Sequence, residues 1–369
     1  MKRLSIQDLR DVVVGATFLG SGGGGSPESG MIIVDLIAKV KKEVRLVEPK
    51  EVADNQYVAM IAGMGSPAAF KERKFGPEGY TDVLYAFDQL QRLYDWAGSQ
   101  FKHIMPCETG GGNTVTPIYV AAVKGLDVVD ADGTGGRSVP ELGTTLYYLY
   151  GIPTSPIVLA DKNGNVVVGW TKNPLDARMA EEVGRHVTVA FGMSAGLGTW
   201  VAAGRQVKTC LEPGVIWKSR EIGRALREAK ERGRDPVAET LRITNGYELI
   251  RGEITNVETK TVEGFDFGKT TIEGIDAYQG KKLMIDFKNE NMIAWRSENE
   301  PVCMVPDSIC LMSLEGSPLT NADIKKGMKI IAIGIPASEK WTKHPEGFGV
   351  WRHILERIGY KGDFVPLKK

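Results

Sequence analysis

Residues 107–142 carry the side chains of this chain that are best suited to acid–base chemistry. The charged side chains in and beside the glycine-rich turns of this segment are Glu108, Asp130, Asp132, Arg137 and Glu141. Glycine lets a backbone approach a ligand closely, and an ordinary connecting turn does not need this many charges. This segment is therefore the candidate active site.

The carboxylates of this run can be combined in two ways. Asp130 and Asp132 lie two positions apart, so on an extended backbone they point to the same side. With Glu108 and Glu141 they could form an acid–base pair with separated pKa values or hold a divalent metal ion. The alternative is structural: Asp130 caps the loop and Asp132 forms an Asx turn before Gly133.

A second glycine run occupies residues 20–27, ahead of a helix predicted near residues 28–42. Backbone N–H groups at the start of a helix suit a carboxylate, a phosphate or a polarised carbonyl. We therefore expect substrate-binding groups at Gly22, Gly23, Gly24, Gly25 and Ser26. The spacing matches no phosphate-binding loop and no lysine follows, so no nucleotide is expected. A tight turn between two helices is the structural alternative.

Further polar residues could orient a substrate. Asn113 follows Glu108 closely, and Ser194 lies in a glycine-rich stretch, residues 192–198, that we predict to be a loop after a strand at residues 187–191. Arg137 could hold a substrate carboxylate or carbonyl, or form an internal ion pair with Glu141. No histidines have zinc-ligand spacing, which disfavours a zinc hydrolase.

The composition disfavours several classes of partner. Lys+Arg 46 balances Asp+Glu 46, which argues against nucleic acid and an anionic membrane surface and favours a small polar substrate. The N-terminus lacks the unbroken apolar region of an export signal, and no apolar run is long enough to span a bilayer. Four cysteines without a CxxC pair fit reduced thiols. These features predict a soluble cytoplasmic protein.

The pattern of elements divides the chain. Residues 1–245 alternate strands, glycine loops and helices, which predicts a layered α/β domain; one glycine loop covers residues 63–74. Ser5 is expected to cap the first helix, and Asn163-Gly164 to turn a hairpin. Residues 246–335 contain short alternating strands typical of a small β-barrel or sandwich. Residues 336–369 return to a helical pattern, and we expect them to pack back on the first domain.

Five motifs occur in a fixed order over residues 8–350: LGSGGGGSP, ETGGGN, GLDVVDADGTGGRSVPEL, VPDSICLM and GMKIIAIGIPASEKW. Together they resemble the S-methyl-thiohydantoin desulfurase family, formerly a domain of unknown function found beside or fused to hydantoinase/oxoprolinase proteins. The acidic loop has an extra glycine relative to the more familiar DGMGRAFPE-like form, which could alter the pocket.

The resemblance implies a three-layer α/β domain joined to a β-barrel-like domain. It also implies hydrolysis of a hydantoin-like ring, with S-methyl thiohydantoin giving hydantoin and methanethiol. Such a reaction needs an activated water, donors for a developing negative charge and an acid for the leaving sulfur. The alternative is a non-catalytic ligand-binding partner of a hydantoinase or oxoprolinase. Apolar and β-rich C-terminal surfaces favour a homo-oligomer.

Overall fold

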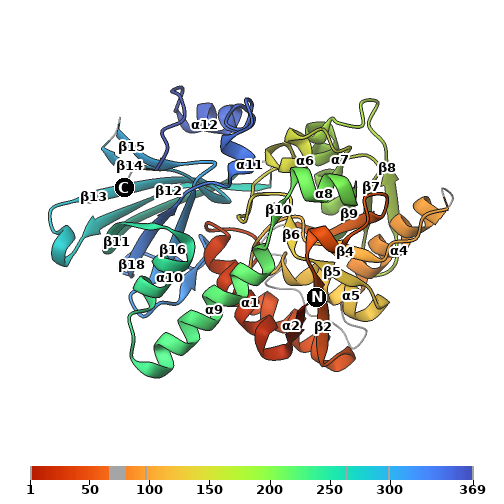
Figure 1. Cartoon of the computed structure of the whole chain (residues 1–369). Coiled ribbons are helices and arrows are strands. Elements are labelled where there is room, and N and C mark those ends of the chain that lie inside the picture. Colours follow the sequence, from red (N-terminus) through yellow and green to blue (C-terminus); the bar gives the residue numbers. More distant parts are fainter. Residues whose placement is uncertain (1, 66–79, 96–97, 263, 298–299, 368–369) are drawn as a thin grey trace.

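Two eight-stranded sheets lie side by side (Figure 1). The computed structural model describes residues 2–65, 80–95, 98–262, 264–297 and 300–367. The predicted glycine loop at residues 63–74 falls mostly outside the described residues. No helix in the described parts is long and apolar enough to cross a membrane.

The first sheet is mixed. Its central strands β2, β5, β4 and β3 are parallel, and β1, β9, β7 and β8 pair antiparallel with their neighbours. In sheet order the strands are β1 (Lys2–Ser5), β2 (Glu43–Val47), β5 (Asp127–Val129), β4 (His103–Met105), β3 (Tyr57–Gly65), β9 (Ser194–Ala203), β7 (Ile157–Ala160) and β8 (Val166–Gly169). The β7–β8 pair confirms the hairpin predicted at Asn163-Gly164.

Helices cover both faces of this sheet, because its strands are apolar on both sides. Ala59 and Ile61 of β3 pack in one core and Met60 and Ala62 in another. The helices that contribute to the first core are α1 (Ile6–Leu19), α2 (Pro27–Val40), α4 (Thr81–Asp95) and α5 (Val115–Lys124). Those that contribute to the second are α6 (Leu146–Leu149), α7 (Ala177–Ala190), α8 (Gly204–Cys210), α11 (Glu339–Thr342) and α12 (Arg352–Ile358).

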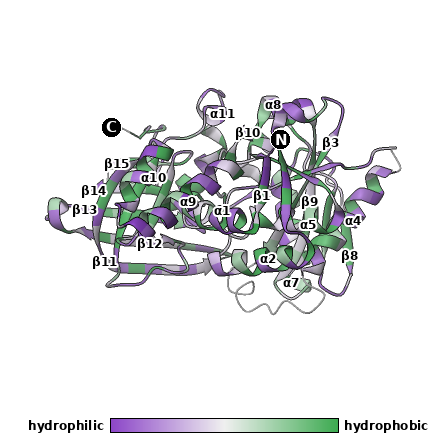
Figure 2. Ribbon diagram, turned by 60° about the horizontal axis from the view of Figure 1, so that its bottom comes forward, coloured by the Kyte–Doolittle hydropathy of each residue, from purple (hydrophilic) through white to green (hydrophobic). Residues whose placement is uncertain are grey.

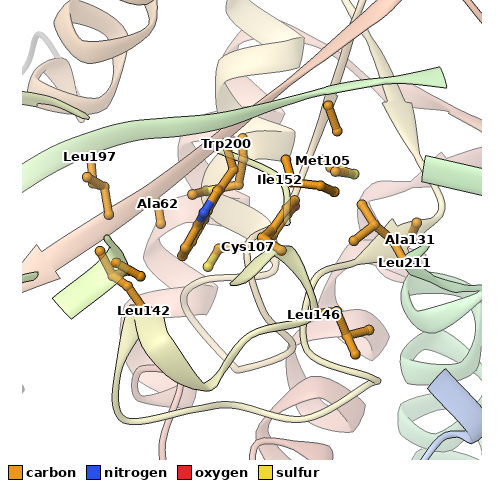
Figure 3. Close-up of a cluster of buried hydrophobic side chains, with 14 of the residues drawn as sticks. Ala62, Met105, Cys107, Ala131, Leu142, Leu146, Ile152, Leu197, Trp200 and Leu211 are labelled. Atoms are coloured by element: carbon orange, nitrogen blue, oxygen red, sulfur yellow. The ribbon is translucent and has the colours of Figure 1, made fainter. Parts of the chain in front are cut away.

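The predicted acidic loop packs against the second core. Figure 3 shows Trp200 among Ala62, Cys107, Leu142 and Leu197. The ring of Trp200 stacks on Tyr147 with centroids 4.6 Å apart. Trp341 and Trp351 from the C-terminal segment are buried in the same core.

The second sheet is antiparallel throughout. Its order is β15 (Glu300–Met304), β14 (Glu290–Ser297), β13 (Lys282–Lys288), β12 (Phe265–Gly274), β11 (Tyr247–Val262), β18 (Lys329–Ile335), β16 (Ser308–Ser313) and β17 (Pro318–Leu319). Among the described residues β15 and β17 remain the two ends of an open order. The predicted barrel is therefore not confirmed, although two large sheets with several helices agree with a mixed α/β fold.

Helices α9 (Val215–Arg232) and α10 (Pro236–Thr244) join the two sheets. Ile222 and Leu226 of α9 pack with Phe18 of α1 and with Ile331 and Ile333 of β18. Helix α9 carries both purple and green segments in Figure 2, as expected for a helix with one buried face. The second sheet is thereby held against the end of α1 from which the glycine loop leaves.

Two local predictions near residue 190 were wrong. The predicted strand at residues 187–191 is mostly the last turn of α7, and the predicted loop at residues 192–198 lies mainly in β9. The β-branched residues favoured a strand locally, but the helix buries Ala180, Gly184 and Thr188 on one face. Gly196 lets β9 approach α4, because a Cβ there would lie 2.4 Å from the Asp82 backbone.

The remaining short elements are β6 (Ala131–Asp132), β10 (Glu212–Pro213), η1 (Pro49–Glu51), η2 (Leu142–Thr144), η3 (Asp276–Tyr278) and η4 (Gly349–Trp351). Strands β6 and β10 pair with each other beside the first sheet. They hold the start of the acidic loop in place.

Candidate active site

A cavity of about 460 Å³ is lined by residues of both sheets and of the glycine loop. Its polar wall includes Glu108, Asn113 and Glu290, and its apolar wall includes Met64 and Leu197. This volume suits a small organic molecule, and a mostly apolar cavity with a few convergent polar groups is the usual form of a ligand site.

Glu108 stands just beyond the carboxyl end of the parallel strand β4, where open α/β sheets place ligands. Its Oε1 accepts a hydrogen bond from Asn113 Nδ2 at 2.6 Å, and its Oε2 accepts one from the Val139 N–H at 2.8 Å. Burial raises the pKa of Glu108, and the bonds from Val139, Asn113 and Ser138 oppose that rise. The structure thus brings the predicted pair Glu108 and Asn113 together at the cavity.

A second carboxyl group, Glu290, approaches Glu108 through a shared hydroxyl. Ser138 Oγ lies 2.8 Å from Glu108 Oε2 and 2.7 Å from Glu290 Oε1. Burial, followed by the charge of Glu108, raises the pKa of Glu290 to about 8. Two buried carboxyl groups that contact the same hydroxyl group favour sharing a proton over carrying two charges.

The glycine loop between α1 and α2 fits closely against this pair. A Cβ at Gly23 would lie 1.9 Å from Glu290 Oε1, and one at Gly24 would lie 2.5 Å from the Gly110 Cα. Ser21 anchors the loop to the second sheet, since its Oγ donates to the Ile309 carbonyl and accepts from the Ile309 N–H. Glycine is therefore needed for these close approaches.

Gly22, Gly23, Gly24, Gly25 and Ser26 all line the cavity, as the proposed substrate-binding role requires. The carbonyl of Gly24 accepts from the N–H groups of Gly112 and Asn113. No hydrogen bond within the described residues uses the amide nitrogens of Gly24 and Gly25. Ser26 also caps α2 by accepting from the Ser29 N–H at 3.2 Å.

Asp130 does not line the cavity. Its Oδ1 accepts from the N–H groups of Ile216 and Trp217 at 2.9 and 3.1 Å, which caps the start of α9. Burial raises the pKa of Asp130, and these two amide bonds oppose the rise. The structure thus places Asp130 as a helix cap.

Asp132 organises its own loop. Its carboxylate accepts from the N–H groups of Thr134, Gly135 and Gly136 and from the Thr109 hydroxyl. Burial raises the pKa of Asp132 to about 6 despite these bonds. This is the Asx-turn alternative weighed from the sequence, and it separates Asp132 from the cavity.

Arg137 is also buried away from the cavity. Its guanidinium donates to the carbonyl oxygens of Pro306 and Asp307 at 3.1 and 2.7 Å and to that of Asn291 at 3.3 Å. Instead of pairing with Glu141, the side chain fastens the acidic loop to the second sheet.

Glu141 lines the cavity and joins a buried charge cluster. Its carboxylate pairs with Lys288 of β13 and lies 2.8 Å from His353 Nε2 of α12. Burial alone would raise the pKa of Glu141, but the bonds to His353 and Lys288 lower it to about 2. The ionised Glu141 holds the end of the acidic loop between the second sheet and the C-terminal helix.

Ser194 is not among the cavity-lining residues. It begins β9 and pairs with Gly65 of β3. Cys107 does line the cavity, but burial raises the pKa of its thiol, so it stays protonated.

The sequence analysis missed Glu290 and Ser138 as site residues. Glu290 directly follows Asn289, which turns the β13–β14 hairpin with φ +54°. Ser138 lay inside a quoted motif without being singled out. A carboxylate between two asparagines at a hairpin was the available signal.

The described residues offer no group of three or more His, Cys, Asp or Glu side chains that could hold a metal ion. The acidic cluster predicted to offer a metal site is dispersed, because Asp130 and Asp132 bind backbone amides elsewhere. Glu108, Glu290 and Asn113 are among the side chains with oxygen atoms that line the cavity.

Family models match both parts of the chain. The model described as "S-Me-THD-like, N-terminal domain" matches residues 7–170, and the one described as "S-Me-THD-like, C-terminal domain" matches residues 175–367. The chain belongs to the S-methyl-thiohydantoin desulfurase family. Strand β9 of the C-terminal segment lies between β3 and β7 of the N-terminal one, so both segments build the first sheet.

Among solved structures, a crystal structure of a protein from Chromobacterium violaceum is similar over 100% of both chains, with a TM-score of 0.85 and 25% sequence identity. No curated protein matches the chain. The arrangement of the two sheets thus recurs over the whole of that solved chain.

Proposed function

We propose that this protein hydrolyses a hydantoin-like ring, converting S-methyl thiohydantoin and water to hydantoin and methanethiol. Membership of the S-methyl-thiohydantoin desulfurase family supports the substrate class. The carboxyl pair at the cavity supports the reaction type, because hydrolysis needs a base for the water and an acid for the sulfur.

The observation that carries this proposal is the environment of Glu108. Its carboxylate accepts from Asn113, the Val139 N–H and Ser138 while facing the cavity. These bonds favour the ionised form, and an ionised carboxylate in a cavity can take a proton from water. We assign Glu108 as the general base.

The glycine loop would stabilise the adduct. As the water oxygen bonds to the ring carbon that carries sulfur, the C=N electron pair moves onto the ring nitrogen. The N–H groups of Gly24 and Gly25, which take part in no hydrogen bond among the described residues, suit this developing charge. Expulsion of methanethiolate restores the C=N bond, and transfer of the hydroxyl proton to nitrogen gives hydantoin.

We further propose that the enzyme works in the cytoplasm as a homo-oligomer, and that residues 1–245 and 246–335 form separate domains with residues 336–369 packed on the first. The burial of Trp341 and Trp351 in the core of the first sheet supports this last assignment.

The test is methanethiol release from S-methyl thiohydantoin by the purified full chain. Glu108→Gln should lower kcat about 10²- to 10⁴-fold, because the amide cannot take a proton from water. Glu182→Gln is the control, since the Glu182 side chain is 71% exposed on α7. Wild-type turnover by the Glu108→Gln variant would contradict the assignment.

A ligand-binding partner subunit is the competing outcome of the same assay. The isolated chain would then bind the ring without releasing methanethiol, and activity would appear only in a co-purified hydantoinase or oxoprolinase. Turnover by the isolated chain excludes this role.

A further inference from the structure

We infer that Glu290 and Ser138 complete a proton relay with Glu108, in which Glu290 is the acid that protonates the leaving sulfur and Ser138 passes its replacement proton. This inference rests on the function proposed above. It is drawn from the position of a residue of the second sheet beside the base of the first.

The hydrogen count at Ser138 requires a shared proton. Ser138 Oγ has a single hydrogen but lies within hydrogen-bond distance of two carboxyl oxygens, Glu108 Oε2 at 2.8 Å and Glu290 Oε1 at 2.7 Å. Both contacts are hydrogen bonds only if one carboxyl group is protonated and donates to Ser138. The pair therefore holds one proton at rest.

The neighbours of the two carboxyl groups decide which one holds that proton. Glu108 also accepts from Asn113 and the Val139 N–H, which favour its charged form. Glu290 is 3% exposed, and its Oε2 has no hydrogen-bond partner within the described residues. The proton belongs on Glu290, which donates to Ser138, and Ser138 donates to Glu108.

The charged groups around Glu290 agree with this direction. Glu108 faces it from beyond β4, and Arg137 of the acidic loop is the nearby cation. The guanidinium of Arg137 is already bonded to the carbonyls of Ser138, Pro306, Asp307 and Asn291. It therefore does not bind the Glu290 carboxyl group.

The relay balances the protons of the reaction. Glu108 takes one proton from water as the oxygen bonds to the ring carbon, so the pair then holds two. When the C–S bond breaks with its electron pair on sulfur, Glu290 gives its proton to form methanethiol. The proton on Glu108 passes through Ser138 to Glu290, and the second water proton moves from the new hydroxyl group to the ring nitrogen.

A purely structural role for Glu290 makes a different prediction. A neutral buried carboxyl group that only packs against Gly23 could be replaced by glutamine, which has nearly the same shape. The proton-transfer role is lost in that replacement, so Glu290→Gln separates the two roles.

The first test varies the leaving group. Glu290→Gln should lower kcat for S-methyl thiohydantoin about 10²-fold or more with little change in KM. The thiolate of an S-aryl thiohydantoin leaves without protonation. Glu290→Gln should therefore leave kcat for this substrate nearly unchanged, whereas Glu108→Gln should lower it. Equal losses on the two substrates, or wild-type rates for Glu290→Gln, would overturn the role of Glu290 as acid.

Ser138→Ala tests the positioning residue. Ser138→Ala should lower kcat and shift the alkaline limb of the pH–rate profile that Glu290 sets, because Glu290 loses its hydrogen-bond partner. Glu182→Gln should leave both kcat and the profile unchanged. An unchanged profile would overturn the relay. Circular dichroism and Tm of each variant exclude loss of fold as the cause.

The second test needs no turnover. The infrared C=O stretch of a protonated carboxyl group should persist at pH 7 in wild type and Glu182→Gln and be absent in Glu290→Gln. If the wild type releases no methanethiol but this band is present, the proposed reaction fails while the shared proton stands. If the Glu290→Gln variant still shows the band of the wild type, Glu290 does not hold the shared proton, even if the enzyme is active.

Discussion

Two glutamates of one chemical type have different roles because their neighbours differ. Glu108 accepts from two groups besides Ser138, whereas Glu290 has an oxygen without a partner within the described residues. An acid–base pair of this kind arises when surroundings push two pKa values apart. The same burial that costs stability is what keeps Glu290 protonated near neutral pH.

The burial of Glu290 predicts that the stability of the protein depends on pH. The pKa of Glu290 is about 8 when folded, against an ordinary value of 4.5. The contribution of protonated Glu290 to the free energy of unfolding is fully present below about pH 4.5. It is lost as pH rises through about 8, because the unfolded chain releases the proton first. Between pH 5 and pH 9 the free energy of unfolding of the wild type should therefore fall by a few kcal/mol more than that of the Glu290→Gln variant.

Urea unfolding at both pH values measures this difference. Other groups titrate in both proteins and cancel in the comparison. Parallel losses of stability in wild type and variant would show that Glu290 does not hold its proton.

At the scale of elements, the glycine loop between α1 and α2 is shaped by what it touches. Its flanking helices begin and end with local signals, such as the Ser5–Asp8 capping box of α1 and the Ser26 cap of α2. The loop itself presses against Glu290, Gly110 and Asn321, which belong to distant parts of the chain. Its function depends on the absence of side chains at these contacts.

Gly23→Ala should reduce both activity and stability. The new Cβ would lie 1.9 Å from Glu290 Oε1, so the carboxyl group must move away from Ser138. We expect kcat to fall at least about 10-fold and stability by about 1–3 kcal/mol, the usual cost of overpacking. Gly143→Ala is the matched control, because its Cβ would meet nothing closer than 3.8 Å. Steady-state kinetics and urea unfolding give both quantities, and equal effects of the two substitutions would refute the contact.

At the scale of the whole molecule, the site exists only because the two sheets meet. Arg137, 1% exposed, bonds the acidic loop to carbonyl groups of the second sheet. Its guanidinium also lies 5.1 Å from the centre of the Trp351 ring of the C-terminal segment. One side chain thereby holds three parts of the chain around the cavity.

Arg137→Lys should destabilise the protein by at least about 3 kcal/mol, because an ammonium group cannot reach all these carbonyls and leaves several unpaired. Arg352→Lys is the control: Arg352 also donates to a carbonyl and a carboxylate, but its side chain is 46% exposed. Its cost should stay within about 0.5 kcal/mol. Chemical denaturation measures both, and a small effect at Arg137 would mean that the sheets are held together elsewhere.

Some features of this protein followed from the sequence alone. The Ser5 cap of α1 and the β7–β8 hairpin were predicted because caps and turns depend on residues a few positions apart. The ordered motifs identified the family. Glu108, Asn113 and the glycine loop were singled out by type and spacing, and the structure does place them around one cavity.

Only the tertiary structure decided the chemistry. Asp130, Asp132 and Arg137 matched the pattern of site residues equally well, but each binds backbone groups away from the cavity. Glu290 is 152 positions from Ser138, and its place between two asparagines at a hairpin does not show that it meets Glu108. A carboxyl group becomes an acid or a base through the groups that burial places beside it, and those neighbours come from segments far apart in the chain.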